Sequence, residues 1–457
     1  MITYFVISFL FSIFLWVNAP IVYVEPYCQA IGWHYILSSI LFLFHKSRIQ
    51  GFFNFYFFFL FSYGCVNYIH PILLYPDDKI LHVFSIPYNH DLISYSLATA
   101  HVAIHLFMIG TFMNFSRHFF PKVKSSKVQY SDISFFERIT LLVTIFFFFF
   151  IFFVLKRISG LQHQNPRIVI VIVALIAISF YLKTSFLSEN RCLKLKDFFI
   201  LNKMNIFSTF FFLISLFSIG SRSYGLNILL FIGGVINLYY CRFRFLQLVG
   251  VLVPMFIFMS VISITRLSPV NFSNSSVFTV FEYSYDYIIG SKDAFALLFT
   301  DFIVNNRNLY EEIDYSIKYG LLFGQTYIPY LFVIVPFGAT LFSNYFLGKD
   351  LRQLNTGALI TDINGAEVGL GSNAVGDLYM NFSYIGVFVM FFVFGAFVNY
   401  AMKSTSFYGR LLYFTLIAFS IYIPRADILS WLSLFMLMIL FLCLRRVYVL
   451  YISILLK

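Results

Sequence analysis

Three arginine residues fall at positions that the sequence places at one level of a membrane. Arg222 lies in SIGSRSYGL, Arg266 follows a long apolar run, and Arg425 lies in IPRADIL between two apolar runs. A guanidinium group stays charged and binds phosphate through two parallel hydrogen bonds, whereas its placement in a bilayer is costly. The three residues together indicate a site for a lipid phosphate or diphosphate. Each one alone is explained equally well by snorkelling to headgroups or, for Arg425, by an ion pair with Asp427.

The segment GLGSNAVGDLYMNFSYIGVF, residues 369–388, joins a glycine-rich polar turn to an apolar run. Asp377 in this segment and Glu367 just before it are candidates for a catalytic base that orients or deprotonates a sugar hydroxyl. A carboxylate at a helix start is as often a cap or a partner of the helix dipole. Glycine lets a ligand approach the backbone closely, and the polar side chains supply the hydrogen bonds that a sugar needs. The candidates for substrate binding in this turn are Gly371, Asn373 and Tyr379.

Two histidines in TAHVAIH, His101 and His105, are separated by about one helical turn, a spacing that can hold a metal ion. No third ligand stands out in the sequence, and buried, hydrogen-bonded imidazoles are the better interpretation. We therefore expect no metal and no cofactor. The sequence contains no Walker loop, no GxGxxG and no GxSxG motif, which fits chemistry that uses no nucleotide.

The composition of the chain defines its class. It has 457 residues, of which 60% are hydrophobic and 11% are charged. Soluble domains carry about 25% charged residues, and apolar stretches near the spanning length of about 20 residues recur along the whole sequence. The alternating pattern of an outer-membrane barrel is missing. These features predict an all-α, polytopic integral membrane protein with a single transmembrane domain over residues 1–457.

Hydropathy predicts about 12 transmembrane helices. Their expected ranges are 3–17, 29–44, 52–69, 91–113, 139–155, 168–183, 205–220, 226–241, 246–265, 377–400, 408–424 and 428–444. With a cytoplasmic N-terminus, most of the 31 Lys and Arg residues fall on the cytoplasmic side, as the positive-inside rule requires. Both termini are therefore expected in the cytoplasm. The net charge of +11 is then a topology signal and indicates no nucleic-acid surface.

One large periplasmic loop, residues 266–376, is expected between the ninth and tenth transmembrane helices. In it, DAFALLFTDFIVNN (293–306) has apolar residues at helical spacing and predicts an amphipathic helix on the membrane or against the bundle. Arg307, directly after this segment, is a further candidate for a diphosphate contact. Residues 321–342 are apolar but interrupted by glycine and proline, which is typical of an interfacial or re-entrant segment.

The C-terminal half resembles the O-antigen polymerases, the Wzy-type polymerases of oligosaccharide repeat units. Four segments carry the resemblance: GSRSYGLNILLFIGG, in which ten residues separate Arg222 from Gly233; FGQTYIPYLFVIVP; GLGSNAVGDLYMNFSYIGVF; and IPRADIL. The sequence departs from the family pattern at Ser383, where relatives often have glycine. It also departs at Phe337, where relatives often have a basic residue, so one phosphate contact of the family is not expected here.

The resemblance implies a glycosyltransferase-type polymerase on the periplasmic face of the bacterial inner membrane. Such an enzyme joins undecaprenyl-diphosphate-linked oligosaccharides into O-antigen or a similar surface polysaccharide, a step of lipopolysaccharide biosynthesis. The implied partners are these lipid-linked oligosaccharides, membrane lipids and a chain-length regulator, and no nucleic acid. In this interpretation the arginines hold the diphosphate and Glu367 or Asp377 is the base.

Three other functions compete with polymerisation. A lipid-linked oligosaccharide flippase also needs cations for a diphosphate, but it would place them in a central cavity and would not need a large outer loop. An O-antigen ligase has a similar layout, and the sequence does not distinguish its acceptor. A solute permease would have broken helices at the midplane of the membrane, whereas the breaks here fall mainly in the outer loop.

Overall fold

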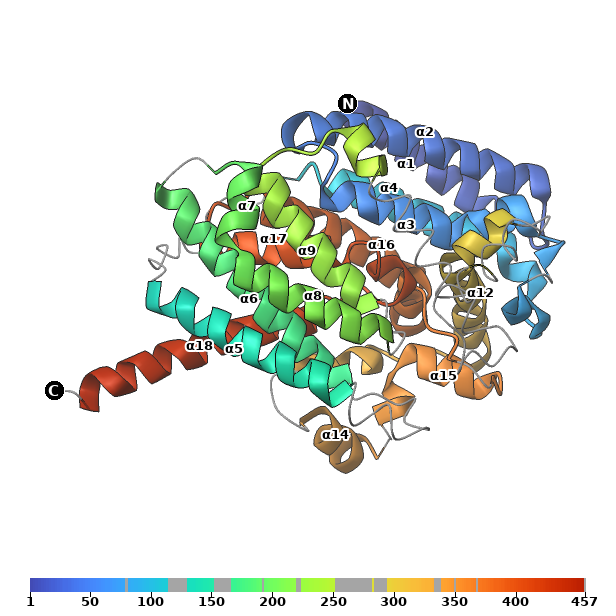
Figure 1. Ribbon diagram of the computed structural model, residues 1–457. Coiled ribbons are helices and arrows are strands. Elements are labelled where there is room, and N and C mark those ends of the chain that lie inside the picture. The colour runs from blue at the N-terminus through green and yellow to red at the C-terminus, as the bar shows by residue number, and fades with distance from the viewer. Residues whose placement is uncertain are drawn as a thin grey trace.

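The computed structural model contains helices and connecting turns, and no strand occurs among the residues that it describes (Figure 1). The expected all-α class is therefore confirmed for these residues. They are residues 1–78, 81–113, 130–151, 166–190, 193–218, 223–250, 282, 294–332, 338–348, 351–366 and 369–455.

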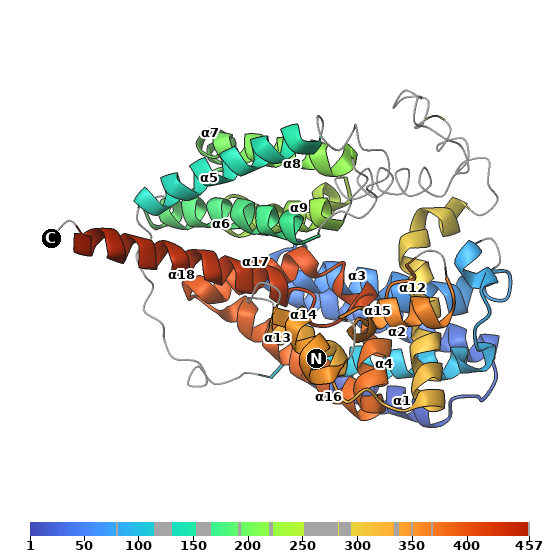
Figure 2. The ribbon, with the colours of Figure 1, turned by 90° about the horizontal axis from the view of Figure 1, so that it is seen from below.

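The first half of the chain forms two groups of helices. The first group is α1 (Ile2–Val17), α2 (Glu25–Gln50), α3 (Phe55–Asn67) and α4 (Ile93–Gly110). The second is α5 (Tyr130–Phe149), α6 (Pro166–Asn190), α7 (Leu195–Leu201), α8 (Lys203–Ser218) and α9 (Ser223–Tyr239). Figure 2 shows the second group as a separate layer that lies over the first group and the C-terminal helices.

The second half contains one long crossing helix, several short helices and three further long ones. The crossing helix is α12 (Ala294–Tyr319). The short elements after it are η8 (Gln325–Tyr327), α13 (Ile328–Leu331), α14 (Gly338–Phe342), η9 (Ser343–Leu347), η10 (Leu351–Leu354) and α15 (Thr356–Ile363). The chain ends with α16 (Ala374–Lys403), α17 (Phe407–Phe419), η11 (Ile423–Arg425) and α18 (Leu432–Leu455).

Five helices of the described part are long and apolar enough to cross a membrane. Two further helices, joined at a sharp bend, would make a sixth span if they are counted together. The five are Glu25–Ser47, His90–Gly110, Ile168–Ser188, Ala374–Lys403 and Leu432–Ile454. The bent pair is Leu195–Leu201 with Lys203–Phe217, at an angle of 79°. These helices indicate a helical membrane protein. The expected number of 12 spans and the sidedness of the termini stay predictions, and most of the expected span 246–265 lies outside the described residues.

Helices α4 and α16 lie against each other because each has a glycine where the two backbones meet. A Cβ atom at Gly110 would lie 2.1 Å from the carbonyl oxygen of Phe392, and one at Gly395 would lie 2.1 Å from that of Phe107. Real Cβ atoms do not come this close, so only glycine fits at both positions. Small residues play this part in helix pairs of membrane proteins. The resulting α4–α16 pair holds the polar N-terminus of α16 in place.

Helix α12 crosses one end of the bundle instead of running along it (Figures 1 and 2). It packs mainly on α16 and α3. The predicted amphipathic helix is thus confirmed and is longer than residues 293–306. Its buried face combines apolar side chains, such as Ile303, Leu309 and Ile313, with polar ones: Asn305, Asn306, Arg307, Asn308, Glu312 and Asp314. Buried polar groups need partners, and those partners define the candidate site.

Helix α16 is broken at Ser383, whose backbone has φ 60° and ψ −171°. The break frees the carbonyl groups of Met380 and Asn381, which would otherwise accept hydrogen bonds from residues four positions later. These carbonyls accept from the N–H groups of Leu322 and Phe323 instead, both at 3.0 Å. The break therefore docks the segment before η8 onto the N-terminal part of α16.

Replacing Ser383 by Gly is expected to stabilise the protein. The φ/ψ region of Ser383 belongs almost only to glycine and costs other residues about 1–3 kcal/mol. Part of the gain is offset by the greater freedom of glycine in the unfolded chain. We expect the free energy of unfolding to rise by about 1 kcal/mol, measured by denaturant unfolding in detergent micelles.

A matched control is Ser134→Gly in α5, where the backbone is helical. Glycine in a helix interior is unfavourable, so this variant should lose about 0.5 kcal/mol. Destabilisation by Ser383→Gly of the same size as by Ser134→Gly would contradict the assignment of strain to Ser383.

Candidate active site

The carboxylate of Asp377 lies at the centre of a cluster of hydroxyl groups, and its side chain is 1% exposed. Thr326 and Tyr327 of η8 and Thr356 of α15 donate hydrogen bonds to it, the one from Thr326 at 3.2 Å. Asn381, one turn along α16, donates at 3.4 Å. We call these five residues the Asp377 cluster. Its donors come from three elements, which the break in α16 and the short helices bring together.

A second carboxylate, Asp427, follows η11 in the turn between α17 and α18. The hydroxyl of Tyr330 donates to Oδ2 of Asp427 at 2.7 Å, and the N–H of Leu429 donates to Oδ1 at 2.9 Å. Tyr327 and Tyr330 lie one turn apart, so each of the two carboxylates receives one tyrosine. Burial and the neighbouring charge of Asp377 raise the pKa of Asp427 to about 7. Unlike Asp377, the side chain of Asp427 is partly exposed.

The guanidinium of Arg425 lies two residues from Asp427 and is partly exposed. Its Cζ atom lies 5.5 Å from the ring centre of Phe302 and 5.9 Å from that of Tyr422. Among the described residues, none of the ion pairs includes Arg425, so the alternative of an Arg425–Asp427 pair is not found. Aromatic faces hold this cation while its N–H groups lack a carboxylate from the described part of the chain.

The glycine-rich turn before α16 wraps around a third carboxylate, the fully buried Glu312 of α12. The hydroxyl of Ser372 donates to Oε1 of Glu312 at 2.7 Å, and the N–H of Asn373 donates at 3.2 Å. A Cβ atom at Gly376 would lie 1.9 Å from Oε2, so the carboxylate occupies the space that a side chain would need. Burial, with a smaller contribution from the charge of Asp377, raises the pKa of Glu312 well above its usual range.

The other polar residues predicted in this turn make contacts within the protein. Asn373 caps α16, because its Oδ1 accepts from the N–H of Val375 at 2.9 Å, and its Nδ2 donates to Oδ1 of Asn67 at 2.9 Å. The hydroxyl of Tyr379 lies 3.1 Å from that of Tyr95 on α4.

Gly371 has φ +80° and lies against Gly357 of α15. A Cβ atom at Gly357 would come within 2.8 Å of the Gly371 backbone. Gly371, Asn373 and Tyr379 therefore hold the site together, and their direct contact with a substrate stays a prediction.

The predicted arginines are only partly described. Arg307 is fully buried: its Nη2 donates to the carbonyl of Pro87 at 3.0 Å and to Oδ1 of Asn364 at 3.1 Å, and Glu311 lies 3.8 Å away. It ties α12 to two neighbouring segments. The other two arginines, Arg222 and Arg266, and the predicted base Glu367 lie outside the described residues, so their roles stay predictions.

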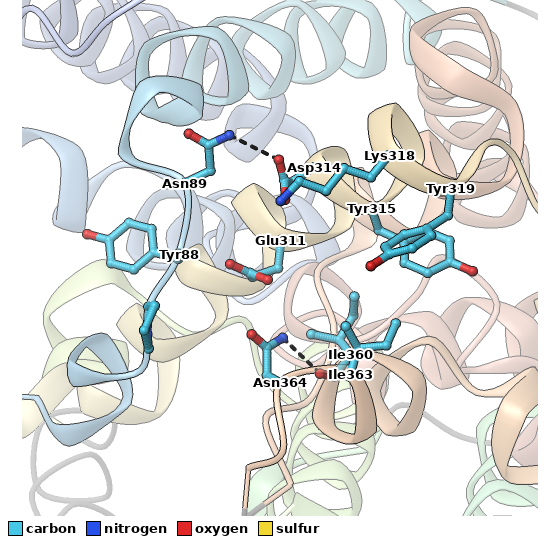
Figure 3. Close-up of a pocket in the computed structure, with 11 residues that line it drawn as sticks. Tyr88, Asn89, Glu311, Asp314, Tyr315, Lys318, Tyr319, Ile360, Ile363 and Asn364 are labelled. Carbon is cyan, nitrogen blue, oxygen red and sulfur yellow. Dashed lines mark hydrogen bonds and ion pairs between the residues drawn. The ribbon is translucent and has the colours of Figure 1, made fainter.

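A pocket of about 340 Å³ opens between α12, α15 and residues 87–89 (Figure 3). The carboxylate of Glu311 lies among the lining side chains, and Asn89 donates to Asp314 at 3.0 Å. The ring centres of Tyr315 and Tyr319 are 5.0 Å apart on one side of the pocket. Aromatic faces combined with carboxylate and amide groups offer both apolar contact and hydrogen bonds to a polyhydroxylated ligand.

The fold and the site define the class of the protein: a helical membrane protein with paired carboxylates, tyrosines and an arginine at one end of its bundle. Comparison with protein-family models, with curated protein sequences and with solved structures finds no match to this chain.

Proposed function

We propose that the protein is a glycosyltransferase-type polymerase of the bacterial inner membrane. It would extend a surface polysaccharide on the periplasmic face from undecaprenyl-diphosphate-linked oligosaccharides, with both termini in the cytoplasm and a chain-length regulator as a partner. The proposal rests on two residues that are close in the sequence. Asp427 is a partly exposed carboxylate with a pKa of about 7, and Arg425 is a cation that has no carboxylate partner among the described residues.

In the proposed reaction, a sugar hydroxyl of one lipid-linked repeat unit attacks the anomeric carbon of the growing glycan. The new carbon–oxygen bond forms as the bond between the anomeric carbon and the diphosphate oxygen breaks. Asp427 takes the proton of the attacking hydroxyl, for which a pKa near the working pH is suited. Arg425 stabilises the negative charge that develops on the departing lipid diphosphate. Two large substrates held side by side gain much of the rate from positioning.

The Asp377 cluster supports this role of Asp427. Asp377 is surrounded by hydrogen-bond donors and is nearly inaccessible to a substrate. Its contribution is therefore to hold Tyr327 in place and to raise the pKa of Asp427. The pocket beside Glu311 supports a glycan substrate, because its tyrosines and polar groups suit a sugar and it adjoins the Arg307 partners Pro87 and Asn364. Asp377 and Asp427 each receive a hydrogen bond from one of two tyrosines a turn apart, a compact arrangement that suits transfer at one place, whereas a flippase needs a path across the bundle.

The test is deletion of the gene in its host followed by complementation with the full chain. A polymerase predicts surface glycans of a single repeat in the deletion strain and long chains after complementation, both seen on glycan gels. Loss of all surface glycan would instead indicate a flippase or a ligase. Lipid-linked repeat units that accumulate only on the inner face would indicate the flippase, and complete polymer that remains on its lipid carrier would indicate the ligase.

The pH dependence of chain extension should move in the variant Asp377→Asn. Asp427 acts in its ionised form, so the rate of the wild type should rise with pH through about 7 and then level off. The charge of Asp377 raises the pKa of Asp427, so its removal should shift this rise toward lower pH. The measurement is the extension rate in membrane vesicles between pH 5 and pH 9.

Asp362→Asn is the matched control for this pH shift, because Asp362 is exposed and pairs with Arg352 at 2.7 Å. It should leave the midpoint unchanged. A midpoint that stays at the wild-type pH in an active Asp377→Asn enzyme would show that Asp377 does not act on the base.

A further inference from the structure

Three histidine side chains meet inside the bundle, away from the Asp377 cluster. His101 and His105 lie one turn apart on α4, and His34 of α2 joins them from 67 residues earlier in the chain. Each offers one ring nitrogen, and these three nitrogens lie within 4.8 Å of one another. Polar residues in the interior of a membrane bundle are costly and are a sign of function.

In each ring, the nitrogen that points away from the centre of the histidine cluster lies within hydrogen-bond distance of an oxygen atom. Nδ1 of His101 lies 2.9 Å from the hydroxyl of Tyr68, and Nδ1 of His105 lies 2.8 Å from the carbonyl oxygen of His101. Nε2 of His34 lies 2.8 Å from Oγ of Ser8 on α1. This is the arrangement around metal-bound histidines, where an oxygen partner on one nitrogen fixes the tautomer and turns the other nitrogen to the metal.

The inward nitrogens have the spacing that a small cation needs. Nδ1 of His34 lies 2.8 Å from Nε2 of His101. Two nitrogens bound tetrahedrally to zinc at about 2.0–2.1 Å lie about 3.3 Å apart. A ring movement that separates the two nitrogens by about 0.5 Å more therefore makes room for the ion. Nε2 of His105 faces the hydroxyl of Ser38 at 3.3 Å, which leaves a fourth position beside that hydroxyl for water.

We propose that His34, His101 and His105 bind one divalent transition-metal ion, with Zn²⁺ as the best fit. Three neutral imidazoles with an open fourth position are a known zinc donor set, and imidazole suits zinc over magnesium or calcium. The ion would link α2 to α4 in the interior of the bundle. This site shares no residue with the proposed transferase site, so its test is independent of the proposed function.

The experiment uses the full chain, purified in detergent with an affinity tag that contains no histidine. After passage over a chelating resin, Zn²⁺ is added, the excess is removed, and bound zinc is measured by mass spectrometry. The wild type should hold one Zn²⁺ per chain. His34→Gln and His101→Gln should each lower the affinity for Zn²⁺, measured by competition with a chromophoric chelator, at least 100-fold. Ser8→Ala, which removes only the oxygen partner of His34, should lower it about 10-fold.

The matched control is His90→Gln, which removes an exposed imidazole outside the cluster and should leave zinc binding unchanged. Thermal unfolding separates loss of the site from loss of the fold. With chelator present, the variants and the wild type should unfold at similar temperatures, and added Zn²⁺ should raise the Tm of the wild type and of His90→Gln but not that of His34→Gln or His101→Gln. Equal zinc affinity in the wild type and His101→Gln, or no effect of Zn²⁺ on the wild-type Tm, would overturn the proposal.

Discussion

Replacing Asp427 by Asn is expected to lower the rate of chain extension about 10²–10⁴-fold. An amide cannot accept the proton of the attacking hydroxyl, so the variant loses the base while it keeps the shape of the side chain. Both hydrogen bonds of Asp427 have a counterpart in Asn: its oxygen accepts from the N–H of Leu429, and its amide donates to the hydroxyl of Tyr330. The fold should therefore persist. The measurement is the length distribution of surface glycan, with extension rates in membrane vesicles.

The control for this loss is Asp362→Asn, which changes an exposed carboxylate of α15. It should support long chains. Asp427→Glu keeps the base but moves it by one methylene, and we expect partial activity. Long chains made by an Asp427→Asn protein present at wild-type abundance would remove Asp427 from the mechanism.

Replacing Arg425 by Ala is expected to reduce chain extension by about 10²–10³-fold, the loss typical for one group that stabilises a developing negative charge. Arg425 is partly exposed and has no ion pair among the described residues, so the alanine variant should keep its fold although it loses the contacts with the rings of Phe302 and Tyr422. Arg425→Lys keeps the charge but not the planar fork that binds two phosphate oxygens. It should fall between the wild type and the alanine variant.

Arg352→Ala is the matched control, because this guanidinium is 62% exposed and pairs with Asp362. It should leave chain length unchanged. Steady-state kinetics with a water-soluble short-chain analogue of the lipid donor add a second readout. An effect of Arg425→Ala on KM alone would assign Arg425 to ground-state binding, and an equal effect of Arg352→Ala would show that the loss comes from surface charge in general.

The helical class and the position of the long helices are predictable from the sequence because they depend on local patterns. Apolar runs and their spacing predict α1 to α4, α16 and α18, and the amphipathic pattern predicts α12. The break in α16 is not predicted, because serine at position 383 gives no sign of the positive φ that its backbone adopts.

The composition of the site depends on contacts between residues far apart in the chain, which one sequence does not show. Tyr330 and Asp427 are 97 residues apart, and Ser372 and Glu312 are 60 apart. The segments FGQTYIPYLFVIVP and IPRADIL contain Tyr327, Tyr330 and Asp427, but nothing in their spacing shows that Tyr330 meets Asp427.

Arg307 and His34 are two further residues whose surroundings the sequence does not show. Arg307 looks from the sequence like an interfacial cation, yet Glu311 and two oxygen acceptors from other segments make its burial possible. His34 has no other histidine near it in the sequence, yet the packing of α2 on α4 places it beside two more imidazoles. Burial of a charged or polar side chain is decided by partners that arrive from distant segments.

The break at Ser383 also determines how deep the reaction would lie. Residues 384–403 of α16 rise about 30 Å at 1.5 Å per residue, which equals the thickness of the hydrocarbon core of a bilayer, about 30 Å. This part of α16 is long and apolar enough to cross the acyl chains by itself, which would leave Asp377, on the other side of the break, near the level of the lipid headgroups. A polyprenyl carrier would present its diphosphate at that height with its tail still dissolved among the lipids. Each round of transfer would then proceed without lifting the carrier out of the membrane.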